Sequence, residues 1–222
     1  MKVAVIQFPG SNCDRDTLQV LRNEMNLDTQ LIWHNDFTTT SFDAVIIPGG
    51  FSFGDHLRAG IIAASSPATE IVRRMANDGK PVLGICNGFQ ILIEAGLLPG
   101  ALLRNSSLKF VCKWMNLHIR NNDSAFTCKF EKESEARMPI AHNEGRFFAE
   151  EDVLNRLEAE DSIVMTYADE NPTGTSRGIT AVTNKDRNVV GMMPHPERAS
   201  DLTLGGTDGL KVFESMVEWA RC

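Results

Sequence analysis

One segment of the chain has the residue spacing of a nucleophile elbow. Gly84-Ile85-Cys86-Asn87-Gly88 places a thiol midway between two glycines. A sharp turn from strand to helix exposes such a nucleophile, and glycines two positions away on either side avoid the Cβ clashes that this turn creates. A single cysteine is more often a buried core residue, so the elbow alone leaves a catalytic and a structural role open.

Cys13 is the alternative nucleophile, because it also follows a predicted strand and a glycine near the start of a helix. It lacks the flanking pair of glycines. The other three cysteines lie in alternating strands or end the chain, and we expect them to be structural or incidental: Cys112, Cys128 and Cys222. An odd number of cysteines without a CxxC pair indicates free thiols in a reducing cytoplasm.

Pro194-His195-Pro196-Glu197 presents an imidazole and a carboxylate together. The prolines restrict the backbone on both sides of the histidine, and residues i and i+2 of an extended segment project to the same side. Glu197 can then hold one ring nitrogen while the other faces a nucleophile, as in a general base and its orienting acid. His142 has its own carboxylate neighbour in Glu144, so this chemistry leaves both histidines open.

Acyl transfer also needs N–H donors for the developing oxyanion, each giving roughly 100- to 1000-fold in rate. The N–H of Asn87, directly after Cys86, is one candidate. Gly50 is the second, because the absence of a side chain lets the backbone approach a substrate. A plain turn is the alternative interpretation of Pro48-Gly49-Gly50.

These candidate residues follow three short apolar strands, Ala44–Ile47, Pro81–Ile85 and Val189–Met193. Short β-branched runs alternate with helical patterns along the chain, which predicts an α/β fold with a mostly parallel sheet and helices on both faces. The carboxyl ends of parallel strands share one edge of the sheet, where ligands bind. The thiol, the imidazole with its carboxylate and the glycine-rich backbone are therefore expected to converge there.

The other expected elements complete one domain, residues 1–222. Strands are predicted at Val3–Phe8, Gln30–Trp33, Ile163–Tyr167 and Gly178–Val182. Helices are predicted directly after Asn12, over Asp55–Asn77 with a break before Pro67, and at Phe89–Ala95, Glu150–Leu157 and Gly209–Ala220. Alternating polar and apolar residues predict a small antiparallel insertion made of Lys109–Arg120, Phe126–Phe130 and Pro139–Phe148.

Composition excludes several function classes. The chain has 222 residues with 29 acidic and 22 basic side chains, a net charge of −7, which argues against binding to nucleic acid or to a membrane surface. No apolar run approaches the roughly 18 residues of a membrane span. The glycine-rich stretches match neither a P-loop nor a dinucleotide fingerprint, and no metal-ligand spacing is present. We therefore expect no nucleotide and no metal on this chain.

Several stretches spread along the whole chain match one family. GxCxG around Cys86 together with Pro194–Arg198 (PHPER) resembles the class I, or triad, glutamine amidotransferases. Within that family, three further stretches are most similar to the glutaminase subunits of phosphoribosylformylglycinamidine synthases: Phe8–Asp14 (FPGSNCD), Pro48–Gly60 (PGGFSFGDHLRAG) and Ala141–Phe147 (AHNEGRF).

The resemblance implies a flavodoxin-like fold and a role for each candidate residue, and it favours His195 over His142 as the base. The implied roles are nucleophile for Cys86, base for His195, orienting acid for Glu197, oxyanion donors for Gly50 and Asn87, and contact with bound glutamine for Gln90. His56 stands where an aromatic residue is more usual in the family, which leaves the role of that side chain open.

The implied reaction hydrolyses glutamine to glutamate and ammonia through a Cys86 thioester. The ammonia then passes to a partner synthetase that uses ATP, with Mg, to convert formylglycinamide ribonucleotide into its amidine in purine biosynthesis. The resemblance implies a large synthetase subunit and a small third subunit as partners, and the absence of a phosphate-binding motif fits ATP binding by the partner. No cofactor is expected on this chain.

Two alternatives remain at this level. The first is a sister amidotransferase that feeds ammonia to a different synthetase, against which FPGSNCD and HNEGRF argue. The second is a non-enzymatic elbow-cysteine domain of similar architecture. Such proteins typically lack His-x-Glu at the end of the last strand, so Pro194–Glu197 argues against that class.

Overall fold

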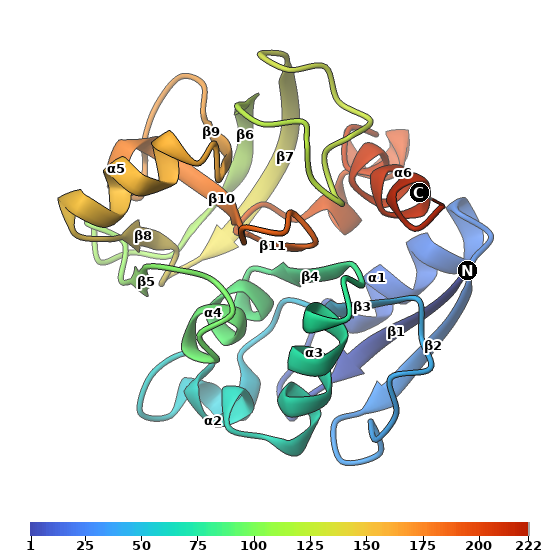
Figure 1. Ribbon diagram of the computed structural model, residues 1–222. Coiled ribbons are helices and arrows are strands. Elements are labelled where there is room, and N and C mark those ends of the chain that lie inside the picture. Colours follow the sequence, from blue (N-terminus) through green and yellow to red (C-terminus); the bar gives the residue numbers. More distant parts are fainter. Residues whose placement is uncertain (222) are drawn as a thin grey trace.

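The computed structural model describes residues 1–221, so Cys222 lies outside the described residues. One large sheet runs through the molecule in the order β2-β1-β3-β4-β11-β10-β9-β6-β7 (Figure 1). Its strands are Lys2–Gln7 (β1), Asp28–Trp33 (β2), Ala44–Ile47 (β3), Val82–Ile85 (β4), Val111–Ile119 (β6), Glu135–His142 (β7), Ile163–Tyr167 (β9), Ile179–Thr183 (β10) and Val189–Met192 (β11). A separate short antiparallel pair joins Ala101–Leu103 (β5) to Arg146–Phe148 (β8).

The strands from β2 to β11 pair in parallel, and they are the apolar runs that the sequence predicts. β3, β4 and β11 are buried at every position, as expected for strands covered on both faces. The chain moves from β1 outward to β2 and from β3 in the opposite direction to β4, so the strand order reverses between β1 and β3. This reversal opens a crevice at the carboxyl ends of the strands.

The helices cover both faces of the parallel strands. They are Asp14–Gln19 (α1), which continues as a π-helical turn to Glu24, Ile61–Ala64 (α2), Pro67–Asn77 (α3), Asn87–Glu94 (α4), Glu151–Ala159 (α5) and Leu210–Trp219 (α6). Figure 1 shows α2, α3 and α4 on one side of these strands and α1 with α6 on the other. Right-handed crossovers in opposite directions along the sheet produce this division. The predicted fold class is confirmed.

The antiparallel part differs in extent from the predicted insertion. β6 pairs with β9 and β7 pairs with β6, so these strands extend the main sheet. The strand predicted at Phe126–Phe130 is wrong, because this segment forms turns in which the Thr127 and Cys128 N–H groups bond to the Ser124 carbonyl. Phe126 and Phe130 are both buried there. Turns can bury such apolar side chains as well as a strand can, so their spacing does not distinguish the two.

The helix predicted from Asp55 begins later, at Ile61. Phe53, Asp55 and Leu57 have left-handed φ angles of 53°, 53° and 67°, which are incompatible with a right-handed helix. This non-helical loop follows β3 and lies beside the crevice. Within residues 1–221, every helix is too short or too polar to cross a bilayer.

Candidate active site

Cys86 occupies a strained turn between β4 and α4, with φ 50° and ψ −104°. The flanking glycines make this turn possible. A Cβ on Gly84 would lie 2.6 Å from the carbonyl of Gly88, and a Cβ on Gly88 would lie 2.0 Å from the carbonyl oxygen of Ile47. The Cys86 N–H donates to Met192 in β11 at 2.7 Å, which ties the turn to the neighbouring strand. The predicted elbow is therefore present, with the strain typical of functional sites.

His195 and Glu197 form the pair that the sequence predicts at the end of β11. Nδ1 of His195 lies 2.6 Å from Oε1 of Glu197, and both side chains are almost completely buried. The His195 N–H donates to the Pro139 carbonyl in β7 at 2.9 Å. Burial disfavours a charged ring, but the Glu197 carboxylate and then Cys86 favour it and raise the pKa of His195 well above its usual value of 6.5.

A cavity of about 170 Å³ opens at this edge of the sheet. Four of the six sequence-predicted site residues line it: Gly50, Cys86, Gln90 and His195. Nε2 of His195 is buried and has no partner within the described part of the chain. The carboxylate of Glu197 lies against the other ring nitrogen. This arrangement leaves one nitrogen of the imidazole available for proton transfer.

Gly50 is held by the loop after β1. The Asn12 N–H donates to Gly49 at 3.2 Å and the Phe51 N–H donates to Gly10 at 2.9 Å, so the two loops form a short bridge. A Cβ on Gly50 would lie 2.6 Å from the Gly10 carbonyl oxygen, so only glycine fits without rearrangement. The Asn87 N–H is at the first residue of α4 and has no acceptor within that helix.

Asn87 and Gln90 are joined in one hydrogen-bonded network. The Asn87 side-chain oxygen accepts from the Ser52 N–H at 3.0 Å, and its amide nitrogen donates to Gln90 Oε1 at 2.8 Å. Gln90 Nε2 in turn donates to the Glu144 carbonyl at 2.6 Å. The network therefore couples the loop after β3, the start of α4 and the loop after β7.

His142 is in the cavity wall but has different partners from those of His195. Its Nδ1 lies 3.2 Å from Oδ1 of Asn105, and the Glu144 carboxylate lies 3.3 Å from Arg104 instead. Burial and the nearby His195 lower the pKa of His142 to about 3. The two His-x-Glu segments look alike in sequence, but only His195 contacts its own glutamate.

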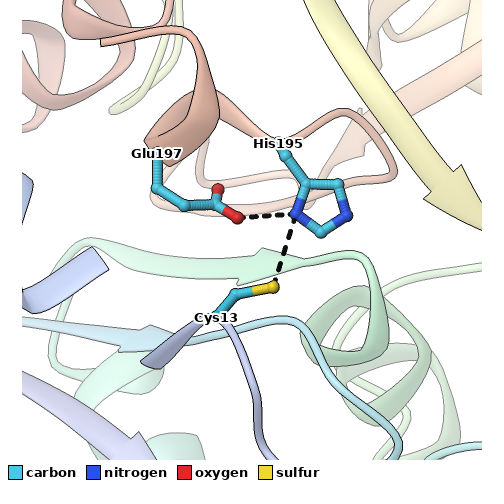
Figure 2. Close-up of side chains that lie close together, drawn as sticks. All are labelled: Cys13, His195 and Glu197. Atoms are coloured by element: carbon cyan, nitrogen blue, oxygen red, sulfur yellow. Dashed lines mark hydrogen bonds and ion pairs between the residues drawn. The ribbon is translucent and has the colours of Figure 1, made fainter. Parts of the chain in front are cut away.

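Cys13 contacts the imidazole of His195. Its Sγ is 3.8 Å from Nδ1 of His195, on the side that faces Glu197 (Figure 2). Arg198 donates to this sulfur at 3.2 Å, and burial raises the pKa of the Cys13 thiol. Gly49 lets these two side chains approach the backbone. A Cβ at this position would lie 2.9 Å from the His195 ring and 3.1 Å from Cys13 Sγ. Sequence reasoning missed Gly49, although it is adjacent to Gly50 in the same motif.

One group of three side chains among residues 1–221 could supply metal ligands. The donor atoms of Cys13, His195 and Glu197 all lie within 4.8 Å of one another. Arg198, 3.2 Å from Cys13 Sγ and 4.0 Å from Glu197, already provides a positive charge at this group. The expectation of no cofactor on this chain stays a prediction.

The model of the CobB/CobQ-like glutamine amidotransferase domain matches residues 1–220. The chain belongs to this family. Two relatives of this amidotransferase chain, phosphoribosylformylglycinamidine synthase subunits PurQ of Methanosarcina acetivorans and Methanosarcina barkeri, are each 50% identical to it over 99% of its length and 98% of theirs. The resemblance inferred from the motifs is confirmed.

One solved structure agrees with this assignment, and a more distant one shares the fold. The structure of PurLQS from Thermotoga maritima contains a chain that matches this amidotransferase with a TM-score of 0.89 and 44% identity, over 98% of both chains. The glutaminase domain of Trypanosoma brucei CTPS has a TM-score of 0.64 at 13% identity, covering 98% of this chain and 94% of that one. The second likeness shows a shared fold alone.

Proposed function

We propose that this chain is the glutaminase subunit of a phosphoribosylformylglycinamidine synthase. It hydrolyses glutamine to glutamate and supplies the ammonia for the ATP-dependent formation of formylglycinamidine ribonucleotide. Full-length identity of 50% to PurQ subunits supports this function over an amidotransferase that serves a different synthetase. The Cys86 elbow beside the His195–Glu197 pair is the observation that carries the proposal, and it argues against a non-enzymatic domain.

The geometry suggests how each residue acts. Cys86 passes its proton to His195 and attacks the side-chain amide carbon of glutamine. The N–H groups of Gly50 and Asn87 stabilise the oxyanion, and His195 returns the proton to the leaving nitrogen, so that ammonia departs. Water then attacks the thioester with His195 as base, which gives glutamate and restores the thiol. Glu197 holds the ring and favours its charged form in both steps.

The proposal assigns the ATP chemistry to other subunits. We propose a large synthetase subunit and a small third subunit as partners, in line with the PurLQS structure to which this chain is similar. ATP and Mg are then used on the synthetase, and the glutaminase subunit needs no cofactor of its own. This division fits the absence of a P-loop motif from the sequence.

Two further proposals concern the chain as a whole. We propose that residues 1–222 act as one domain, supported by a single apolar core that spans both parts of the large sheet. We also propose that it works in the cytoplasm. Cys13, Cys86, Cys112 and Cys128 are free thiols, and a thiol nucleophile is preserved in a reducing compartment.

Replacement of the nucleophile tests this function. In the assembled synthase, Cys86→Ala should abolish synthesis from glutamine and leave synthesis from ammonium salt intact, because only the ammonia source is removed. Cys112→Ala, which changes an exposed cysteine away from the cavity, is the matched control and should leave both activities unchanged. Loss of both activities in an assembled Cys86→Ala complex would contradict the proposal.

A further inference from the structure

The cavity is lined by charged side chains of both signs. Arg198 lies against Cys13 and is paired with Asp16 at 3.5 Å. Asp55 and Glu144 also line the cavity, next to the Asn87–Gln90 network. The mechanism above uses neither carboxylate. Glutamine carries its neutral, reacting amide at one end and an α-ammonium group with an α-carboxylate at the other, so only its ammonium group is a favourable partner for these two carboxylates.

Asp55 is placed in the cavity wall by an unusual backbone. Phe53, Asp55 and Leu57 all adopt left-handed φ angles, and each such residue costs free energy that contacts with its surroundings must offset. The Phe53 N–H is held by the Pro9 carbonyl at 2.7 Å, and the Asp55 carboxylate is 3.5 Å from the Asn87 amide nitrogen. The strained loop thus presents a carboxylate beside the Asn87–Gln90 network.

The environment of Asp55 is unfavourable for a lone negative charge. Partial burial, and then the nearby Glu144 carboxylate, raise the pKa of Asp55 to about 6. Arg104 pairs with Glu144 at 3.3 Å, and no cation pairs with Asp55 in the described part of the chain. A cation bound beside Asp55 would stabilise the negative charge of its carboxylate. Two adjacent carboxylates without a cation on Asp55 therefore form a candidate site for a positively charged group.

We propose that Asp55, with Glu144, binds the α-ammonium group of the glutamine substrate and so selects α-amino amides over amides that lack this group. This inference rests on the proposed glutaminase function and deepens it. Asp55 carries the larger share, because Glu144 is already paired with Arg104. A charge-assisted hydrogen bond of this kind corresponds to roughly 10- to 100-fold in affinity.

The test compares two ligands that differ only in the α-amino group, L-glutamine and glutaramate (5-amino-5-oxopentanoate). Their dissociation constants are measured by calorimetry on the assembled complex with Cys86→Ala, which cannot consume them. Glutamine should bind roughly 10- to 100-fold more tightly than glutaramate. Adding Asp55→Asn should weaken glutamine binding by about that factor and leave glutaramate binding unchanged, and Glu144→Gln should have a smaller effect of the same kind.

Asp78→Asn is the matched control, because Asp78 is an exposed carboxylate at the opposite edge of the sheet, before β4. It should change neither ligand's affinity. Equal weakening for both ligands in Asp55→Asn, or no preference for glutamine in the parent complex, would overturn the inference. A parent synthase without any glutaminase activity would instead contradict the proposed function, so the two failures are distinguishable.

A pH series on the same variants supplies a second readout. Glutamine affinity should fall as the pH is lowered through about 6, where Asp55 takes up a proton, and the affinity should vary less with pH in Asp55→Asn. The other titratable or charged groups that face this cavity in the Cys86→Ala complex are Cys13, Glu144 with Arg104, His142, His195 and Arg198. His142 stays neutral above a pH of about 3, and Cys13 stays a thiol because burial raises its pKa. The Glu197 carboxylate raises the pKa of His195 well above 6.5, and Arg198 stays charged, so none of these four groups changes charge near pH 6. A profile that Asp55→Asn leaves unaltered would contradict the inference.

Discussion

Cys13 and His195 are 182 residues apart in the chain, and the Cys13 sulfur lies 3.8 Å from the ring nitrogen that Glu197 holds. Cys86, in the turn after β4, also influences the charge of this imidazole, so two cysteines from different loops lie near one histidine. Their surroundings differ: Cys86 is at a strained elbow facing the cavity, whereas Cys13 accepts a hydrogen bond from Arg198 and donates one to Asn12 at 3.0 Å. Both cysteines line the cavity, but only Cys86 is at the strained elbow that we expect of the nucleophile.

A glutamine analogue with an electrophilic side chain should therefore label Cys86 and leave Cys13 unmodified. Burial raises the pKa of Cys13, so that it remains a thiol at neutral pH, and a thiol is a poor nucleophile. Peptide mapping by mass spectrometry measures the label at each cysteine. Cys86→Ala should abolish labelling and Cys13→Ser should preserve it. A label on Cys13 in the unmodified chain would reverse the assignment.

His195→Ala should reduce glutaminase turnover by about 10³-fold or more, because it removes the group that moves both protons. Glu197→Gln should be less damaging, since Glu197 orients the ring and is not itself a proton acceptor. His142→Ala should chiefly change KM for glutamine or coupling to the synthetase, because His142 is in the cavity wall and bonded to Asn105. Steady-state kinetics on variants shown to be equally well folded measure these effects. If His195→Ala retained its turnover, His195 would not be the base.

The pH dependence of stability should report the buried His142. Its pKa is about 3 in the folded chain and about 6.5 when unfolded, so the unfolded state binds more protons between these values. The folded state therefore loses up to about 1.4 kcal/mol per pH unit as the pH falls below 6.5. Denaturant unfolding at several pH values measures the slope. His142→Gln should have a shallower slope than the parent chain, and an equal slope would contradict burial of a neutral ring.

Gly88→Ala should destabilise the elbow strongly, by about 1–3 kcal/mol or more, because its Cβ would overlap the Ile47 carbonyl oxygen at 2.0 Å. Gly79→Ala is the matched control. No atom lies within 4 Å of a Cβ at Gly79, and only its φ of +78° opposes the change, at about 1 kcal/mol. Thermal melting compares the two variants. Equal losses of stability would show that the elbow relaxes around the added methyl group.

The isolated subunit should be a poor glutaminase that becomes active in the assembled synthase with nucleotide and acceptor bound. A displacement of about 1 Å can cost roughly 100-fold in rate, and the Pro48–Gly54 loop that carries Gly50 is rich in glycine. Glutaminase assays with and without the partner subunits measure kcat/KM. Equal values would show that the oxyanion donors are already in place in the free subunit.

The parallel strands and the elbow could be predicted because local signals specify them. Ala44–Ile47 and Val82–Ile85 are short apolar runs ended by glycine or by the elbow, and each occurs where the sequence indicates. The position of Asp55 could not be predicted, because the left-handed loop around it depends on hydrogen bonds to the loop after β1. The contact of Cys13 with His195 depends in the same way on strand order.

The antiparallel part was predicted less well for a related reason. Alternation in Lys109–Arg120 indicates a strand but does not indicate which strand it pairs with, and β6 pairs with β9 across a long segment of chain. Likewise, the sequence places Glu144 near His142, yet the partner of His142 is Asn105. Side-chain pairing between loops is a tertiary property that spacing along the chain does not encode.

β7 is an edge strand, hydrogen-bonded to β6 alone in the large sheet, and Pro139 lies within it, as edge positions permit (Figure 1). The same strand supplies the Pro139 carbonyl that holds the His195 N–H and two residues of the cavity wall, Ala141 and His142. Edge segments open in local fluctuations that cost less than global unfolding. Hydrogen exchange in β7 should therefore track the lifetime of the competent site, and a protein that keeps its parallel core intact can still lose catalysis when this strand detaches.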